Sequence, residues 1–145
     1  MDETLETLLY GMQFKKLLEK LLLPIENKYD LNKVDLQIMF YLYSAGSRNT
    51  SKDIMELKRF TRGHISQSLG RLQKKGYITI ELDTKDRRCM HNYLTECSED
   101  IIEQLRDVFA RVREIIFTGI TEEEKEVLIS AVQKISRNIN EVIST

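Results

Sequence analysis

The chain has 145 residues, which is room for one compact domain with an extension and too few for a multidomain enzyme. Hydrophobic residues make up 41%, tryptophan is absent and proline occurs once, so the composition favours a folded, helix-rich chain. With 22 basic and 23 acidic residues the formal net charge is only -1, and composition alone does not indicate a polyanionic partner.

The first 30 residues are expected to form a leading helix. Two apolar stripes run along it at helical spacing, from Leu5 to Met12 and from Phe14 to Ile25. Apolar residues around so much of the helix indicate contact with a partner subunit as well as with the chain's own core. Pro24 lacks the N–H that would bond the carbonyl of Lys20, so we expect a kink there before the helix ends near Asp30.

Three shorter helices are expected next. Each begins with a residue whose side chain can cap a helix, and an aspartate follows three residues later in the first two. Gly76 ends the third helix, since glycine readily adopts the left-handed conformation. The three helices are expected from Asn32 to Ser44, from Thr50 to Leu57 and from Thr61 to Lys75.

A hairpin is expected after these helices. Apolar residues alternate with polar ones from Ile78 to Leu82, and the charged run Asp83 to Arg88 separates this strand from a second extended stretch, Cys89 to Leu94. The second strand alternates poorly. We expect it to place Met90 and Leu94 on one face, and His91 and Tyr93 on the other.

The last third predicts two long helices. From Ile101 to Ile115 the apolar residues are spaced alternately four and three apart, and the same heptad spacing runs from Leu128 to Val142. Gly119 separates the helices, and Thr121 with Glu124 forms a capping box. Seams this wide exceed what one helical pair needs, although a single chain could also satisfy them. We therefore assign residues 1–30 and 95–145 to dimerisation, and residues 31–94 to a separate unit.

The order of this central unit, three helices followed by strand, charged loop and strand, predicts a winged helix-turn-helix fold. In that fold the third helix lies in the DNA major groove and the hairpin reaches the neighbouring backbone or minor groove. Residues 58–88 carry a net charge of +6, while the rest of the chain carries -7. The face of the third helix opposite Ile65, Leu69 and Leu72 has no acidic residue. A merely solvated helix is the alternative.

Candidate DNA contacts lie on this helix. Gln67 and Arg71, four residues apart, have the chemistry to bond base edges, glutamine to adenine and arginine to guanine. The other side chains suit phosphates, which position a protein without reading sequence. They are Thr61, Arg62, Ser66, Lys74 and Lys75, and His64 is a further candidate contact.

The hairpin tip mixes charges of both signs. We expect Asp83, with Asp86, to pair with Arg88 and stiffen the loop, which leaves Lys85 and Arg87 to project towards the minor groove. A solvated turn is the alternative for the tip taken alone.

The sequence resembles the multiple-antibiotic-resistance-type (MarR) regulators of bacteria and archaea over almost its whole length. The tip, followed by Leu94-Thr95, looks like the family's D-x-R-D-x-R wing and L-T helix start. Lys85 stands where arginine is usual, and lysine cannot make arginine's forked contact, so minor-groove reading is expected to be weaker. A second departure is Gln67, at a position where the family often carries arginine. The resemblance implies a homodimer that binds a pseudo-palindromic operator in double-stranded DNA, usually as a repressor released by a small-molecule effector or by oxidation.

The resemblance also implies a ligand pocket between the leading helix and the DNA-binding unit. Phe14, Met39, Phe40 and Tyr43 could line it, or could belong to the core. Cys89, His91 and Cys97 raise a zinc site or a thiol switch, but no C-x-x-C pair is present. Peroxide-sensing relatives carry a cysteine near the leading helix, and none stands there in this sequence.

No catalytic motif is found, so we expect neither an enzyme nor a cofactor. Two cysteines, a start unlike a secretory signal and no long apolar stretch predict a cytoplasmic protein without membrane contact. The function we expect is that of a dimeric, sequence-specific transcriptional regulator. A winged-helix protein-interaction module and a thiol-based redox regulator are the alternatives.

Overall fold

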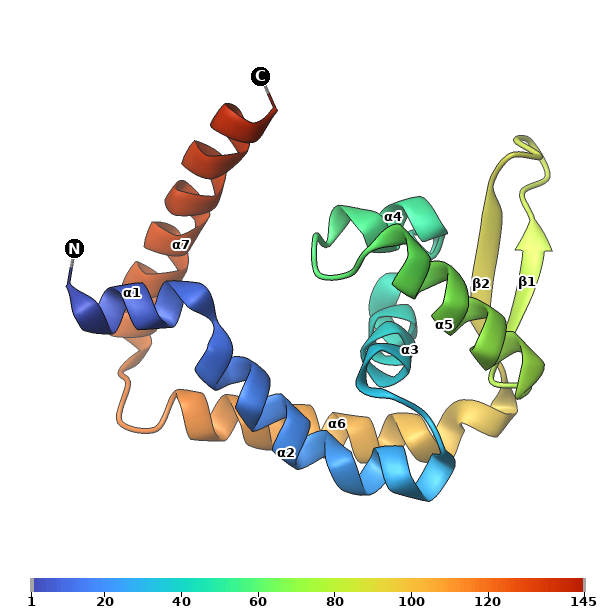
Figure 1. Cartoon of the computed structure of the whole chain (residues 1–145), viewed down its shortest axis with the longest axis horizontal. Helices are drawn as coiled ribbons and strands as arrows, with labels where there is room; N and C mark the ends of the chain where they lie inside the picture. Colours follow the sequence, from blue (N-terminus) through green and yellow to red (C-terminus); the bar gives the residue numbers. More distant parts are fainter. Residues whose placement is uncertain (1, 145) are drawn as a thin grey trace. The chain divides into compact units, whose positions relative to one another are not determined.

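The computed structural model describes residues 2–144, without the side chains of Thr7 and Tyr10. The chain divides into two compact units, residues 1–110 and 111–145, and each is considered by itself. As expected, the fold is mainly helical with a two-stranded hairpin (Figure 1). Its elements are α1 (Glu3–Tyr10), α2 (Met12–Tyr29), α3 (Lys33–Ala45), α4 (Ser51–Glu56), α5 (Arg62–Lys74), β1 (Ile78–Leu82), β2 (Met90–Leu94), η1 (Glu96–Ser98), α6 (Glu99–Ile116) and α7 (Glu122–Ile143).

The leading segment is two helices, and the expectation of one was wrong. Gly11 adopts φ 69°, a left-handed conformation that glycine tolerates without strain, and its N–H bonds the carbonyl of Leu8 to close α1. The side chain of Asp2 caps the start of α1. The second helix, α2, continues through Pro24 to Tyr29 and is capped by Asp30, where the backbone is again left-handed.

Local capping explains most helix boundaries. Asn32 with Asp35, Thr50 with Asp53, and Thr121 with Glu124 form reciprocal capping boxes at the starts of α3, α4 and α7. The side chain of Thr61 accepts the N–H of His64 and so caps α5. Gly76 and Gly119 have φ 84° and 77°, as expected for residues that follow helix ends.

The core of the first unit forms around α3. This helix packs against α2, α5 and β2, and its Leu36, Ile38 and Met39 are completely buried. Ile101 and Leu105 bring the first part of α6 into the same core. Phe40 stacks on Phe109 with 4.4 Å between ring centroids, and Gln104 Nε2 donates to the Tyr29 hydroxyl at 2.6 Å.

The hairpin pairs β1 with β2 in antiparallel register, from Ile78 opposite Leu94 to Leu82 opposite Met90. One feature of β2 was missed: its buried side chain is Asn92, on the face of Met90 and Leu94. Its N–H and Nδ2 both donate to the carbonyl of Asn49, whose own Nδ2 donates to the Asn92 carbonyl at 2.9 Å. The segment before α4 therefore lies beside β2, and Thr50 forms an isolated antiparallel bridge with His91.

The second unit consists of the end of α6 and all of α7. None of the described residues of α7 is buried in this chain. The heptad seam predicted from the sequence is correspondingly exposed, with 45% exposure at Leu128, 54% at Val132, 38% at Ile135 and 54% at Ile139. No helix within residues 2–144 combines the length and the hydropathy that spanning a membrane requires.

Candidate nucleic-acid interface

The helix α5 has one buried and one exposed face. Ile65, Ser68, Leu69 and Leu72 are buried, and they pack towards α3, α4 and β1. The opposite side, called here the outward face, consists of Arg62, Gly63, His64, Ser66, Gln67, Gly70 and Lys74, all of them exposed. No acidic residue lies between Thr61 and Lys75, so the outward face presents donors and positive charge to solvent. A Cβ added at Gly63 or Gly70 would meet no atom within 4 Å, so the space above both is open.

Arg71, predicted to read a base, forms an ion pair within the chain. Its Nη1 donates to Asp35 Oδ1 at 2.7 Å, and Asp35 is completely buried. The side chain of Arg71 is therefore held against α3, with 37% of it exposed. Sequence inspection missed this pairing because the two residues are 36 positions apart and an aspartate in a capping box already has a local role.

The tip of the wing is braced internally, but with partners that differ from those predicted. Asp86 Oδ1 accepts the N–H of Arg88 at 3.0 Å and its Nε at 3.3 Å, as expected. The predicted pairing of Asp83 with Arg88 was wrong. Asp83 Oδ1 instead accepts the N–H groups of Lys85 and Asp86, and Asp83 Oδ2 lies 2.8 Å from His91 Nε2. Lys85 and Arg87 remain exposed, as predicted.

These contacts lower the pKa of both carboxyl groups at the tip of the wing. The hydrogen bond from His91, followed by those from the two backbone N–H groups, lowers the pKa of Asp83 to about 2. The N–H and the guanidinium of Arg88 lower the pKa of Asp86. Both carboxylates are therefore charged at neutral pH and hold the loop in place.

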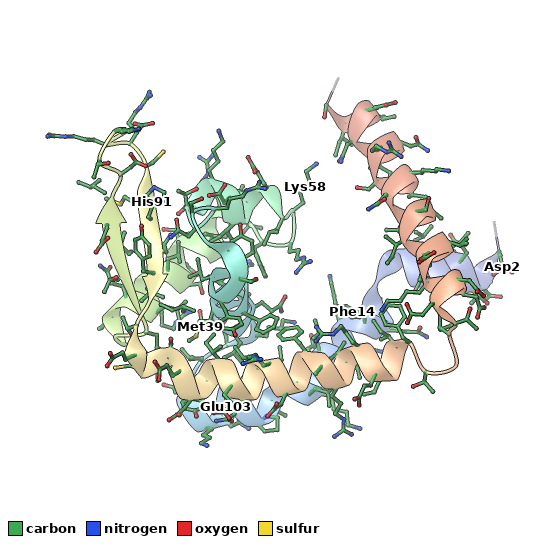
Figure 2. All side chains as sticks on the ribbon, turned by 180° about the vertical axis from the view of Figure 1, so that it is seen from behind. Asp2, Phe14, Met39, Lys58, His91 and Glu103 are labelled. Atoms are coloured by element: carbon green, nitrogen blue, oxygen red, sulfur yellow. The ribbon has the colours of Figure 1, made fainter. Side chains whose placement is uncertain are left out.

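His91, labelled in Figure 2, connects the wing to the segment before α4. Its Nδ1 lies 2.5 Å from Asn49 Oδ1, and its Nε2 faces Asp83. The orientation of the Asn49 amide is fixed, because its Nδ2 donates to the Asn92 carbonyl, and its Oδ1 therefore faces the His91 ring. Both neighbours of the ring are thus acceptors, and it can donate to both only with a proton on each nitrogen. Sequence reasoning had considered His91 only as a metal ligand.

The surroundings of the two cysteines bear on the proposed zinc site and thiol switch. Among the described residues no three His, Cys, Asp or Glu side chains are grouped so that they could hold a metal ion. Burial, together with the charge of Asp86, raises the pKa of the Cys89 thiol, which disfavours the reactive thiolate. Cys97 is exposed.

The four residues that could line a ligand pocket lie in different surroundings, and Met39 fits the alternative that it belongs to the core. Met39 is completely buried in the core, and Figure 2 shows it well apart from Phe14. Phe40 makes ring contacts with both Tyr43 and Phe109. Phe14 lines a separate cavity of about 570 Å³, bounded by α2, the start of α3, the α4–α5 loop and His64.

Comparison with known proteins agrees with this geometry. Residues 31–97 match the family described as winged helix DNA-binding domain. Over 126 residues the chain is 25% identical to the uncharacterized HTH-type transcriptional regulator YwaE of Bacillus subtilis, and the match covers 87% of this chain and 73% of that protein.

Solved structures share the fold of nearly the whole chain. A MarR/EmrR family regulator from Acinetobacter sp. ADP1 superposes with a TM-score of 0.80 at 20% identity, over 96% of this chain and 97% of that one. A MarR regulator from Methanosarcina mazei Go1 has a TM-score of 0.73 at 15% identity, over 97% and 99%. The S. aureus MepR–DNA complex has a TM-score of 0.72 at 19% identity, over 95% and 98%.

The match over residues 31–97 and the exposed helix and wing place the chain in the class of winged-helix folds. Within that class the chain has the MarR fold, with helices on both sides of the winged helix in the sequence. The sequence resemblance is thereby confirmed at the level of fold. The Acinetobacter and Methanosarcina structures are described as transcriptional regulators, and the S. aureus structure as a complex of MepR with DNA.

Proposed function

We propose that this protein is a transcriptional regulator that binds operator DNA as a homodimer and represses until a small effector releases it. The observation on which the proposal rests is the outward face of α5, exposed and free of acidic residues, beside a braced wing that exposes Lys85 and Arg87. Gln67 would read a base edge in the major groove. Thr61, Arg62, His64, Ser66 and Lys74 would hold phosphates, and the wing would lie along the neighbouring minor groove. Such a protein works in the cytoplasm, where the DNA is.

Charge reversal tests DNA binding. Lys74→Glu with Arg87→Glu should weaken binding to the gene's own upstream DNA by at least about a hundredfold in a fluorescence anisotropy titration, since two attractive phosphate contacts per subunit become repulsive. Lys16→Glu with Lys20→Glu is the matched control, because it makes the same change of charge on exposed α2 residues. Equal reductions in affinity in the two double variants would refute the assignment of the interface.

Dimerisation is inferred from the exposed seam of α7. Val132 is 54% exposed although it lies on an apolar stripe, and an apolar stripe of this length is normally covered by a partner. A second copy of the chain is the partner that a pseudo-palindromic operator requires. Val132→Glu should sediment as a monomer at micromolar concentration, and the neighbouring Gln133→Glu should remain dimeric. A dimeric Val132→Glu would exclude this seam as the contact.

The effector is assigned to the cavity that contains Phe14. Its apolar lining includes Phe14, Leu18, Val34 and Phe60, and none of the described residues that line it is acidic. Its volume is within the usual range for ligand sites, and Lys15 lies on its border. This combination fits a small aromatic carboxylate. Lys15→Gln should weaken release of DNA by such compounds about threefold, whereas Lys16→Gln, outside the cavity, should not.

Two alternatives make different predictions. A protein-interaction module would retain its partner after the reversal of Lys74 and Arg87, and would show no preference for its own upstream DNA. A redox regulator would lose its response to oxidant on Cys89→Ser or Cys97→Ser. The raised pKa of Cys89 argues against the first of these two thiols as the sensor.

A further inference from the structure

Asp35 links its own helix, α3, to α5 from a completely buried position. Its Oδ2 accepts the N–H of Asn32 and completes the capping box of α3. Its Oδ1 accepts the Ser68 hydroxyl at 2.5 Å and Arg71 Nη1 at 2.7 Å, and both donors belong to α5. Ser68 is itself 1% exposed. A buried carboxylate is costly unless it is paired and hydrogen-bonded, and here both oxygens have partners.

Ser68 and Arg71 lie at the boundary between the buried and the exposed face of α5. Residues three apart on a helix share a face, so Ser68 and Arg71 attach α5 to α3 along one line. The apolar contacts of Ile65, Leu69 and Leu72 are not directional, and they would tolerate some rotation of α5 about its axis. Hydrogen bonds depend on angle as well as distance, and a pair of them to a single oxygen resists that rotation.

We propose that Asp35 positions α5 for DNA, and that Ser68 and Arg71 act through Asp35 without contacting a base. The inference rests on the DNA binding proposed above and deepens it. It assigns specificity on α5 to the outward face, with Gln67 as its base-reading residue. It also converts an arginine that sequence inspection places among the base readers into a positioning residue.

One detail of the geometry allows a sharp test. Arg71 reaches Asp35 through Nη1, a single contact that a lysine ammonium can also make. A guanine contact by arginine uses two donors at once, and lysine cannot reproduce that forked geometry. Arg71→Lys and Arg71→Met therefore separate the two roles. Arg71→Lys keeps a cation beside Asp35. In Arg71→Met the carboxylate keeps the Ser68 hydroxyl and the Asn32 N–H, and thermal melting of both variants verifies the fold before DNA binding is compared.

The probe is a duplex that the wild-type chain selects from random sequence, compared with a scrambled duplex of the same composition. Arg71→Lys should keep the wild-type preference within about threefold, and Arg71→Met should lower it about tenfold. The slope of log binding constant against log salt should be unchanged in Arg71→Met, because every phosphate keeps its partner. In the Asp35→Asn background Arg71→Met should cost nothing further, as expected for residues that act as one unit.

Other results would overturn the proposal. If Arg71→Lys loses the preference as fully as Arg71→Met, Arg71 reads a base. If the salt slope of Arg71→Met becomes shallower by about one per subunit, the change expected when a phosphate loses its cation, Arg71 binds a phosphate. If Asp35→Asn does not fold, the comparison of Arg71→Lys with Arg71→Met still distinguishes a positioning role of Arg71 from base reading. A wild-type chain that selects no duplex would instead refute the proposed function itself.

Discussion

At the scale of single residues, the wing depends on polar side chains that have specific partners. Asp83 holds the tip through two backbone N–H groups and contacts His91, and His91 reaches Asn49 on the segment before α4. The positively charged residues at the tip thus stand on a loop with fixed geometry. A fixed loop loses less conformational entropy when it meets DNA than a mobile one.

Acid should loosen this loop. The pKa of Asp83 is lowered from an ordinary 3.8 to about 2 in the folded protein, so its charged form is favoured by folding. The stabilisation is complete above about pH 4 and disappears as the pH falls towards 2. We expect the melting temperature of the wild type to exceed that of Asp83→Asn at neutral pH, and the gap to shrink on acidification. A gap independent of pH would contradict the assignment.

Asn49 offers a second residue-scale prediction. It is 2% exposed, and its side chain bonds both the carbonyl of Asn92 and the ring of His91. Asn49→Ala leaves a buried carbonyl without its donor and should destabilise the fold by about 2 kcal/mol in chemical denaturation. Ser47→Ala, at an exposed position two residues earlier, should have almost no effect. A destabilisation below about 0.5 kcal/mol for Asn49→Ala would exclude a structural role.

At the scale of elements, an N-cap fixes where α5, the helix that we assign to the major groove, begins. Thr61 was predicted both as a helix start and as a phosphate contact, and its oxygen accepts the His64 N–H at 3.1 Å. Its hydroxyl proton is still available to a phosphate, so one residue can serve both purposes.

Thr61→Ala should lower stability by about 1 kcal/mol, the usual value for removal of an N-cap, and should weaken DNA binding as well. Thr61→Ser retains the hydroxyl and should restore both properties. Thermal melting and anisotropy titrations on the same samples measure the two effects. Full DNA affinity in Thr61→Ala would remove Thr61 from the interface and leave it only as a cap.

At the scale of the whole molecule, charge is distributed unevenly along the chain. The net charge of -1 combines +6 on residues 58–88 with -7 on the rest, so attraction to DNA is confined to α5 and the wing, with repulsion elsewhere. A protein with this distribution should bind DNA in one orientation.

Salt should therefore weaken binding steeply. If six to ten phosphates are contacted by the dimer, the binding constant should fall by about 10³- to 10⁵-fold between roughly 50 and 200 mM salt. Gel-shift or anisotropy titrations at several salt concentrations give the slope. The Lys74→Glu and Arg87→Glu double variant should have a shallower slope, and the Lys16→Glu and Lys20→Glu control should not. A flat slope for the wild type would be inconsistent with binding through phosphates.

The sequence by itself determined the features that depend on neighbours a few residues away. Capping residues, glycines with positive φ and helical or alternating spacing act within one or two turns, so the helices α3 to α7, the hairpin and the acid-free face of α5 could be predicted. The break at Gly11 was local too, but the uninterrupted apolar pattern across it concealed the signal.

Only the tertiary structure decided which distant polar groups meet. Arg71 bonds to Asp35, which is 36 positions away in the sequence. His91 and Asn92 bond to Asn49, which is 42 and 43 positions away. In the sequence Arg71 is an exposed cation on a DNA-facing helix, and Asn92 is a polar residue in a strand. Their roles follow from the burial of partners that folding brings together, because an unpaired polar group is costly in a core and acceptable in water.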